Sequence, residues 1–365
     1  MDNRELRANG NSKRHGGLDA LRALAALFVI VNHATYLPAG SGEDAKWCAA
    51  VIYTIALSAV PLFVMMSGAF ILNRDKNSNA RTFYWHSFKK LFPLSALMFL
   101  VYFCLYTDYP LQFVQGTESL GSMVKHFLVW YGNGAAVPLW YICMLPGLYL
   151  LAPLFVIIRR NTSLRVQMLL CGMFMALYFC QYGLHLWNLV HPLSAVSWIG
   201  YFLLGMILMN LAGAGRLPSV RSMLWCSPII LAVLVFMAYG YIAGHDDIYP
   251  QFEGIMTPSS LLVACGLFII FAQLKDISCG WLVSKFAEVS FLVYLTHVLV
   301  QRLLRCALFH LDLISYLHHD YVISFSFTVL SVILTFLMSW GMHIAYKKLC
   351  VAIGACLAKC KRQDA

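Results

Sequence analysis

The chain has 365 residues, of which 61% are hydrophobic and only 12% are charged, and its formal net charge is +10. Soluble domains are typically about 45–50% apolar and about 25% charged, so this composition predicts a polytopic membrane protein. Its apolar runs are continuous and do not alternate with polar residues, which excludes a transmembrane β-barrel. The twelve cysteines are scattered without a C-x-x-C pair, so we expect neither a disulfide framework nor a metal site.

Ten apolar segments of about the length that a membrane-spanning helix requires follow one another along the chain. They cover residues 18–38, 49–72, 91–107, 137–158, 166–183, 196–212, 222–243, 257–273, 286–308 and 322–346. We therefore predict an all-α fold of about ten transmembrane helices in one domain, residues 18–346, flanked by tails at 1–17 and 347–365.

Lysine and arginine gather in alternate connections and in both tails, whereas the opposite loops hold only Lys46 and Lys125. By the positive-inside rule, both termini are expected to be cytoplasmic. This distribution assigns the basic charge to the membrane surface, so we expect membrane lipids and not nucleic acid as partners. The tail after residue 346 is expected to form a short interfacial helix.

The first segment, LDALRALAALFVIVNHATYL, carries three ionisable residues, Asp19, Arg22 and His33. Such residues are costly inside a membrane helix and tend to mark functional sites. Arg22 and His33 are about three helical turns apart, so they share one helix face and are separated by about 16 Å along the axis. Asp19 precedes Arg22 by one turn and is placed to neutralise it.

The second connection is basic, and the long outer connection, from residue 108 to 136, is rich in aromatic residues. The basic residues are Arg74, Lys76, Arg81, Lys89 and Lys90, and the aromatic ones include Tyr109, Phe113, Trp130 and Tyr131. Lysines beside a span usually reach toward lipid headgroups, and binding of an anionic ligand is the alternative. Aromatic residues beside a membrane usually anchor the protein there, and stacking on sugar rings is the alternative.

A second intramembrane histidine, His297, lies about 18 Å from the cytoplasmic edge of its segment, and His33 lies about 22 Å from the edge of the first segment. A lone histidine can be a packing residue, but two at similar depth favour a functional site. Imidazole is a suitable general base near neutral pH, and Arg22 suits phosphate or carboxylate. We therefore expect an anionic cytoplasmic ligand whose reactive end lies about 16 Å from Arg22, about the reach of a phosphopantetheine arm.

Further motifs follow in order: VPLFVMMSG from residue 60, FKKLFP from 88, PLWY from 138, GYFLLG from 200 and SFLVYLTH from 290. Together with the Arg22–His33 helix, this series resembles the acyltransferase-3 family of membrane acyltransferases. The order of elements is similar to that of stand-alone O-acetyltransferases of the enterobacterial common antigen type. One departure is that Lys89 and Lys90 stand where the family has arginines.

The resemblance implies a ten-helix enzyme of the bacterial inner membrane that moves an acyl group from cytoplasmic acyl-CoA to a hydroxyl of a cell-surface or lipid-linked glycan. Acetyl-CoA is the favoured donor, although succinyl-CoA also fits, and no metal is expected. The donor phosphates are expected against Arg22, Arg74, Arg81, Lys89 and Lys90. His33 is the expected base or acyl carrier and His297 the residue that orients the acceptor, while Trp140, Tyr141 and Ser67 either line the substrate path or serve packing.

Two other classes fit the same composition. A transporter or polysaccharide exporter would use the intramembrane Arg and His to line a polar path without chemistry. Many transporters contain inverted repeats, and this sequence shows none. A sensor whose basic inner face recruits a partner is the second alternative. Consumption of acyl-CoA by the purified protein would separate the enzyme from both.

Overall fold

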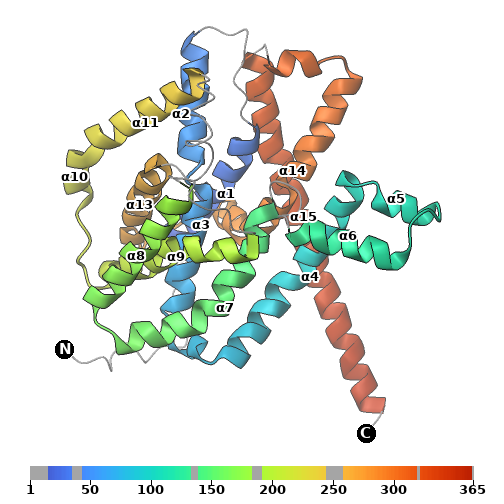
Figure 1. Cartoon of the computed structure of the whole chain (residues 1–365), viewed down its shortest axis with the longest axis horizontal. Coiled ribbons are helices and arrows are strands. Elements are labelled where there is room, and N and C mark those ends of the chain that lie inside the picture. Colours follow the sequence, from blue (N-terminus) through green and yellow to red (C-terminus); the bar gives the residue numbers. More distant parts are fainter. Residues whose placement is uncertain are drawn as a thin grey trace.

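The computed structural model describes residues 15–34, 43–132, 139–182, 191–243, 258–318 and 321–363, whose regular structure is entirely helical (Figure 1). Eight helices within these ranges are long and apolar enough to cross a membrane. The seventh and eighth predicted segments correspond to the shorter apolar helices α11 (Ser227–Ala243) and α13 (Pro258–Gln273). The prediction of an all-α polytopic membrane protein is thus confirmed.

The remaining helices match the other predicted segments and their connections. They are α1 (Gly16–Ala34), α2 (Glu43–Ala56), α3 (Ala59–Leu72), η2 (Asp75–Ser78), α4 (Ala80–Tyr106), α5 (Tyr109–Val114), α6 (Leu120–Gly132), α7 (Trp140–Asn161), α8 (Leu164–Tyr182), α9 (His191–Gly213), α10 (Val220–Met223), η4 (Leu224–Cys226), α14 (Trp281–His310), η6 (Ile314–His318) and α15 (Tyr321–Gln363). The second predicted segment therefore consists of two helices, α2 and α3.

Helix α4 begins earlier than its apolar segment. The side chain of Asn79 accepts a hydrogen bond of 3.1 Å from the backbone N–H of Thr82, which is a standard cap for a helix N-terminus. The basic run that was expected to be a connection therefore forms the first turns of α4, and Lys89 and Lys90 lie inside the helix.

The chain after residue 346 does not form a separate interfacial helix. It continues α15 to Gln363, and Figure 1 shows this part leaving the bundle as one uninterrupted helix. The sequence contains no proline between α15's apolar part and its basic end, so nothing breaks the helix there.

Helix α1 lies at the centre of the bundle, where it packs against α2, α3, α13, α14 and α15 (Figure 1). Its faces are therefore covered by protein. Because the segment with Arg22 and His33 is interior, both side chains are directed at neighbouring helices.

Helices α3 and α9 pack with their backbones in contact. A Cβ placed on Gly68 would overlap the backbone of Phe202, and one on Gly205 would overlap the backbone of Met65. Small residues permit this close approach between membrane helices. The glycines of the VPLFVMMSG and GYFLLG motifs thus have a packing role.

Candidate active site

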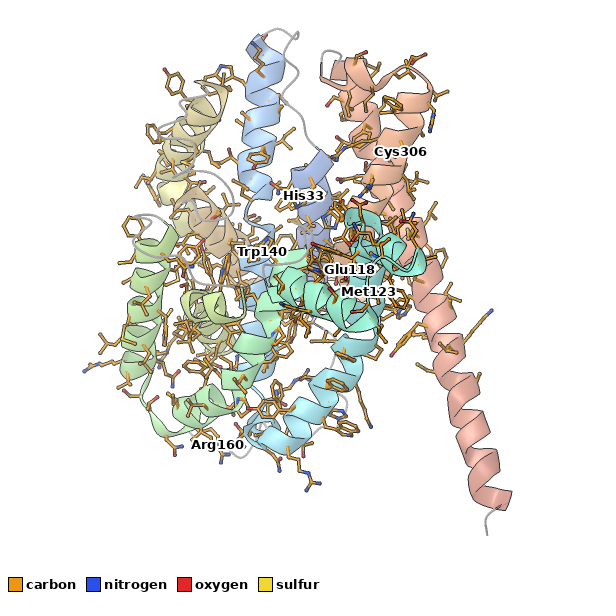
Figure 2. All side chains as sticks on the ribbon, turned by 45° about the vertical axis from the view of Figure 1, so that its right-hand side comes forward. His33, Glu118, Met123, Trp140, Arg160 and Cys306 are labelled. Atoms are coloured by element: carbon orange, nitrogen blue, oxygen red, sulfur yellow. The ribbon has the colours of Figure 1, made fainter. Side chains whose placement is uncertain are left out.

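The two intramembrane histidines meet between α1 and α14. The ring centroids of His33 and His297 are 5.1 Å apart, with the rings tilted by 37°. His297 is fully buried, whereas His33 is half-buried in the last turn of α1. Figure 2 shows His33 near the end of α1 on the side of α14. The similar depths expected from the sequence thus correspond to direct proximity of the two imidazoles.

The tautomer of His297 follows from its hydrogen bond. Its Nδ1 lies 2.7 Å from the carbonyl oxygen of Tyr294, and a carbonyl only accepts, so Nδ1 carries the proton. The neutral ring then has its lone pair on Nε2, which is buried and has no hydrogen-bond partner among the described residues. Buried polar atoms are usually paired. This nitrogen is therefore available to accept a hydrogen bond from His33, water or a substrate hydroxyl.

Side chains of α14 also bond the end of α1. The amide of Gln301 donates to the carbonyl of Ile30 at 3.0 Å, and the guanidinium of Arg305 donates to the carbonyl of His33 at 3.3 Å. The carbonyl of His33 is one of the last four of α1, which lack partners within the helix, and that of Ile30 directly precedes these four. The two bonds therefore fix the end of α1, and with it His33, against α14.

Sequence reasoning did not identify Gln301 and Arg305 as part of the site. A signal was present, because His297, Gln301 and Arg305 follow at intervals of four residues and so share one face of a helix. The face that carries the second histidine is thus polar over about two turns.

Arg22 lies at the opposite end of α1 from His33. Its guanidinium pairs with Asp19 at 3.3 Å, as the sequence predicted, and lies 5.1 Å from the centroid of the Phe70 ring. Its side chain keeps 31% of its surface exposed. The side chain of Arg22 is therefore only partly covered by the protein.

Three of the five predicted donor-binding cations come together. Lys90 of α4 has Arg22 of α1 and Arg74, just before η2, as charged neighbours. We call Arg22, Arg74 and Lys90 the cation cluster. These three positive charges come from separate elements and repel one another. An anion bound among them would offset this repulsion, so the cluster is suited to an anion. The described residues contain no group of side chains that could hold a metal ion.

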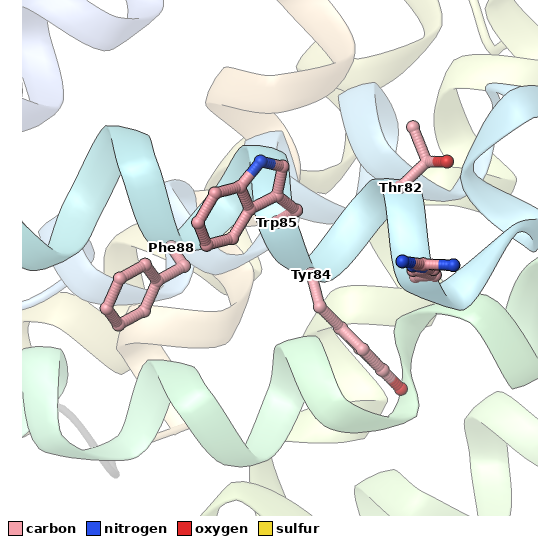
Figure 3. A pocket seen from close by; sticks show the side chains of 5 residues that line it. Thr82, Tyr84, Trp85 and Phe88 are labelled. Atoms are coloured by element: carbon pink, nitrogen blue, oxygen red, sulfur yellow. The ribbon is translucent and has the colours of Figure 1, made fainter.

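The other two predicted cations lie on an outward face of α4. The Nζ of Lys89 lies 4.5 Å from the centroid of the Trp85 ring. Arg81 lines a cavity of about 810 Å³ together with Thr82, Tyr84, Trp85 and Phe88 (Figure 3). Arg81 and Lys89 are therefore beside the cation cluster on the same helix but belong to a different surface.

Ser67 lies between the cation cluster and the histidines. Its side chain faces the hydroxyls of Tyr141 and Tyr149, both on α7. Tyr149 is in turn an electrostatic neighbour of Arg22. Ser67 is therefore placed within a polar layer between α3 and α7.

Tyrosine rings continue this series to the imidazoles. The ring of Tyr141 lies 5.2 Å from that of Tyr294, and the ring of Tyr294 lies 5.7 Å from that of His297, between centroids. A series of polar and aromatic side-chain contacts thus runs from Tyr149, which is an electrostatic neighbour of Arg22, to the histidine pair. Sequence reasoning included Tyr141 but missed Tyr149 and Tyr294, because a tyrosine in an apolar segment looks the same whether it packs or lines a site.

Trp140 contacts a different group of rings. Its centroid lies 5.5 Å from that of Trp198, which is fully buried on α9, and Trp198 packs against Tyr178 and Tyr201. Trp140 therefore joins an aromatic cluster between α7, α8 and α9. These contacts favour the packing interpretation of Trp140.

The aromatic residues of the long outer connection also pack within the protein. Trp130 and Tyr131 of α6 lie edge-on to Phe99 of α4, with centroids 6.4 and 5.0 Å away. Tyr109 stacks on His126 at 3.8 Å. One face of the Tyr109 ring is therefore covered by His126, and Trp130 and Tyr131 both contact Phe99.

Within the part of the chain that the structure describes, a helical bundle thus has a cation cluster toward one end of α1 and an imidazole pair at the other, with one of the two rings fully buried. The chain belongs to the acyltransferase-3 family, because the family's model, described as an acyltransferase domain, matches residues 15–344. The match includes every helix that contributes to the site. The protein is therefore a multi-pass membrane acyltransferase. No curated protein and no solved structure matched the chain.

Proposed function

We propose that this protein is an O-acetyltransferase of the bacterial inner membrane that uses cytoplasmic acetyl-CoA and acetylates a hydroxyl of a cell-surface or lipid-linked glycan. It would act in the manner of the stand-alone enzymes of the enterobacterial common antigen type. The observation that carries the proposal is the series of contacts from the cation cluster to the histidine pair. Membership of the family supports acyl transfer, and the donor, acyl group and glycan acceptor are proposed.

The cation cluster is suited to the phosphates of coenzyme A. Guanidinium groups bind phosphate through paired, charge-assisted hydrogen bonds, and an ammonium group adds a point charge. The pantetheine arm would extend past Tyr149, Ser67 and Tyr141. Because His33 lies about 16 Å along α1 from Arg22, the thioester would reach the imidazoles.

His33 would then act as the general base. The acceptor oxygen forms a bond to the thioester carbonyl carbon, its proton passes to His33, the C–S bond breaks, and the thiolate of coenzyme A recovers the proton. His297 accepts only at Nε2, since its Nδ1–H is donated to Tyr294. A His33 N–H donated to this atom would turn the other nitrogen of His33, with its lone pair, toward the acceptor.

The test uses membranes from cells that make the native glycan, with labelled acetyl-CoA added from the cytoplasmic side. We expect the wild-type protein to transfer label to glycan and His33→Ala to lose about 100-fold or more of this activity, the usual contribution of a general base. His310→Ala is the matched control, because His310 is an exposed histidine at the end of α14.

Each alternative outcome has a separate meaning. Full transfer by His33→Ala would contradict its role as base. Transfer from succinyl-CoA but not from acetyl-CoA would correct the acyl group. No transfer from either donor, combined with loss of glycan translocation on deletion, would support the exporter instead.

A further inference from the structure

The hydroxyl of Tyr102, a fully buried residue of α4, bonds the backbone of α14. It accepts a hydrogen bond of 3.0 Å from the N–H of Leu299 and donates one of 3.1 Å to the carbonyl of Leu295. In a regular α-helix, the N–H of a residue pairs with the carbonyl four positions earlier. Tyr102 therefore bridges two groups that ordinarily pair with each other.

The bridged turn is the one that carries His297. This residue lies midway between Leu295 and Leu299, and its Nδ1 bonds the carbonyl of Tyr294 at 2.7 Å. Two consecutive carbonyls, those of Tyr294 and Leu295, thus accept hydrogen bonds from side chains. A side chain inserted into the backbone ladder of a helix alters its local course. The bridge of Tyr102 therefore bonds the backbone on both sides of His297.

The same turn is held from its other side by α15. Thr296 and Ser339 share a hydrogen bond of 2.9 Å between their hydroxyls, and both residues are fully buried. The turn from Leu295 to Leu299 is therefore held by α4 on one side and by α15 on the other, so its position relative to both helices is defined.

A purely structural explanation is that a buried tyrosine hydroxyl must find a partner. One acceptor would satisfy that need, and it would not have to lie in a helix. Tyr102 instead bonds both a donor and an acceptor of one turn, and this turn contains a histidine of the active site. The arrangement is more specific than hydrogen-bond satisfaction requires.

We propose that Tyr102 is a positioning residue for His297: its hydroxyl holds the turn from Leu295 to Leu299 so that the imidazole of His297 stays against that of His33. The inference rests on the proposed function, since His297 orients the reacting groups there. Tyr102 itself does not contact the substrate in this role.

Tyr102→Phe removes only the hydroxyl. We expect kcat for acetyl transfer to fall about 10- to 100-fold, the effect of a misplaced catalytic group, while KM for acetyl-CoA stays within about twofold. The control is Tyr106→Phe, one turn later on α4, whose ring packs against Tyr102 with centroids 5.7 Å apart but whose side chain is exposed. An unchanged kcat in Tyr102→Phe would overturn the proposal.

A double-mutant cycle separates positioning from a general loss of stability. In the His297→Gln background, Tyr102→Phe should cause no further fall in kcat, because its effect passes through His297. An additive loss would place the effect of Tyr102 elsewhere and contradict the proposal. If Tyr102→Phe folds poorly, p-aminophenylalanine introduced at position 102 keeps a hydrogen-bonding group and should restore kcat.

A spectroscopic measurement tests the inference without acyl transfer. In protein with ¹⁵N-labelled histidine, the signal lost in His297→Gln identifies His297, which should have a protonated Nδ1 and an unprotonated Nε2 in the wild type. Tyr102→Phe should shift or broaden this signal, and Tyr106→Phe should not. An unaltered signal in Tyr102→Phe would contradict the positioning role. If the wild type and His33→Ala were both inactive in acetyl transfer, only the proposed function would be contradicted.

Discussion

The two histidines differ in how firmly the protein holds them. His297 is fully buried and bonded to a backbone carbonyl, whereas His33 is half-buried and held through its own backbone. The side chain of His33 is thus less restricted by hydrogen bonds that the structure describes. This difference suits a division in which one ring is fixed and the other exchanges a proton.

Arg305 offers a test of how His33 is held. Arg305→Met removes the bond to the carbonyl of His33, and hydrogen bonds from charged groups contribute about 1.5–3 kcal/mol. We expect a lower thermal unfolding midpoint in detergent and reduced acetyl transfer. Arg302→Met is the control, since Arg302 lies over the ring of Tyr106 at 4.4 Å, a contact contributing about 0.5–1 kcal/mol. Equal effects of the two substitutions would show that the bond to His33 has no special role.

At the level of single residues, the sequence predicted those relations between side chains that depend on the geometry of one helix alone. The relation of Arg22 to His33 and the Asp19–Arg22 pair follow from helical geometry alone. Tyr102, Tyr149 and Tyr294 could not be assigned, because their roles depend on which helices are neighbours. The proximity of His33 and His297 could likewise not be predicted, because the sequence gives the depth of each residue in the membrane but not which helices are neighbours.

Among the elements, α4 joins two parts of the site. Lys90 belongs to the cation cluster, and Tyr102 bonds the turn of His297 about 18 Å further along the same helix. The sequence analysis placed Lys90 in a connection because hydropathy alone defined the segments. The cap at Asn79 was the local signal that the helix begins earlier.

The contact between α3 and α9 is a second property of elements that can be tested. Gly68→Ala or Gly205→Ala would force two backbones apart, and overpacking of this kind costs about 1–3 kcal/mol. Thermal unfolding in detergent should show a lower midpoint for either variant. Gly172→Ala in α8 is the control, because the added methyl group meets nothing within 4 Å and alanine favours a helix. A Gly68→Ala protein as stable as the control would contradict the close packing.

For the whole molecule, the separation of the cation cluster from the histidines predicts separable kinetic effects. Lys90→Gln should raise KM for acetyl-CoA severalfold with little change in kcat, because contacts remote from the reaction contribute to the ground state and the transition state alike. Lys89→Gln is the matched control, since Lys89 lies over Trp85 on the outward face of α4. A fall in kcat without a change in KM for Lys90→Gln would contradict the assignment of the cluster to the donor.

The overall fold, like the site, was predictable from the sequence only in part. Continuous apolar segments identified the ten principal helices, because the hydrocarbon thickness of a membrane sets their length. The break that divides α2 from α3 and the extension of α15 to Gln363 were not anticipated. The break lies within an apolar run and the extension lies beyond one. Both depend on local helix signals that do not change the hydropathy of the run.

The end of α1 inside the protein has an electrostatic consequence. His33 lies in the last turn of α1, where the aligned peptide dipoles place about half a negative charge. An imidazolium that forms there is stabilised by this field, while the nearby guanidinium of Arg305 opposes it. The helix terminus thus favours uptake of a proton by His33, and the charge of Arg305 favours its release, so the two contributions together allow the ring to accept a proton without retaining it.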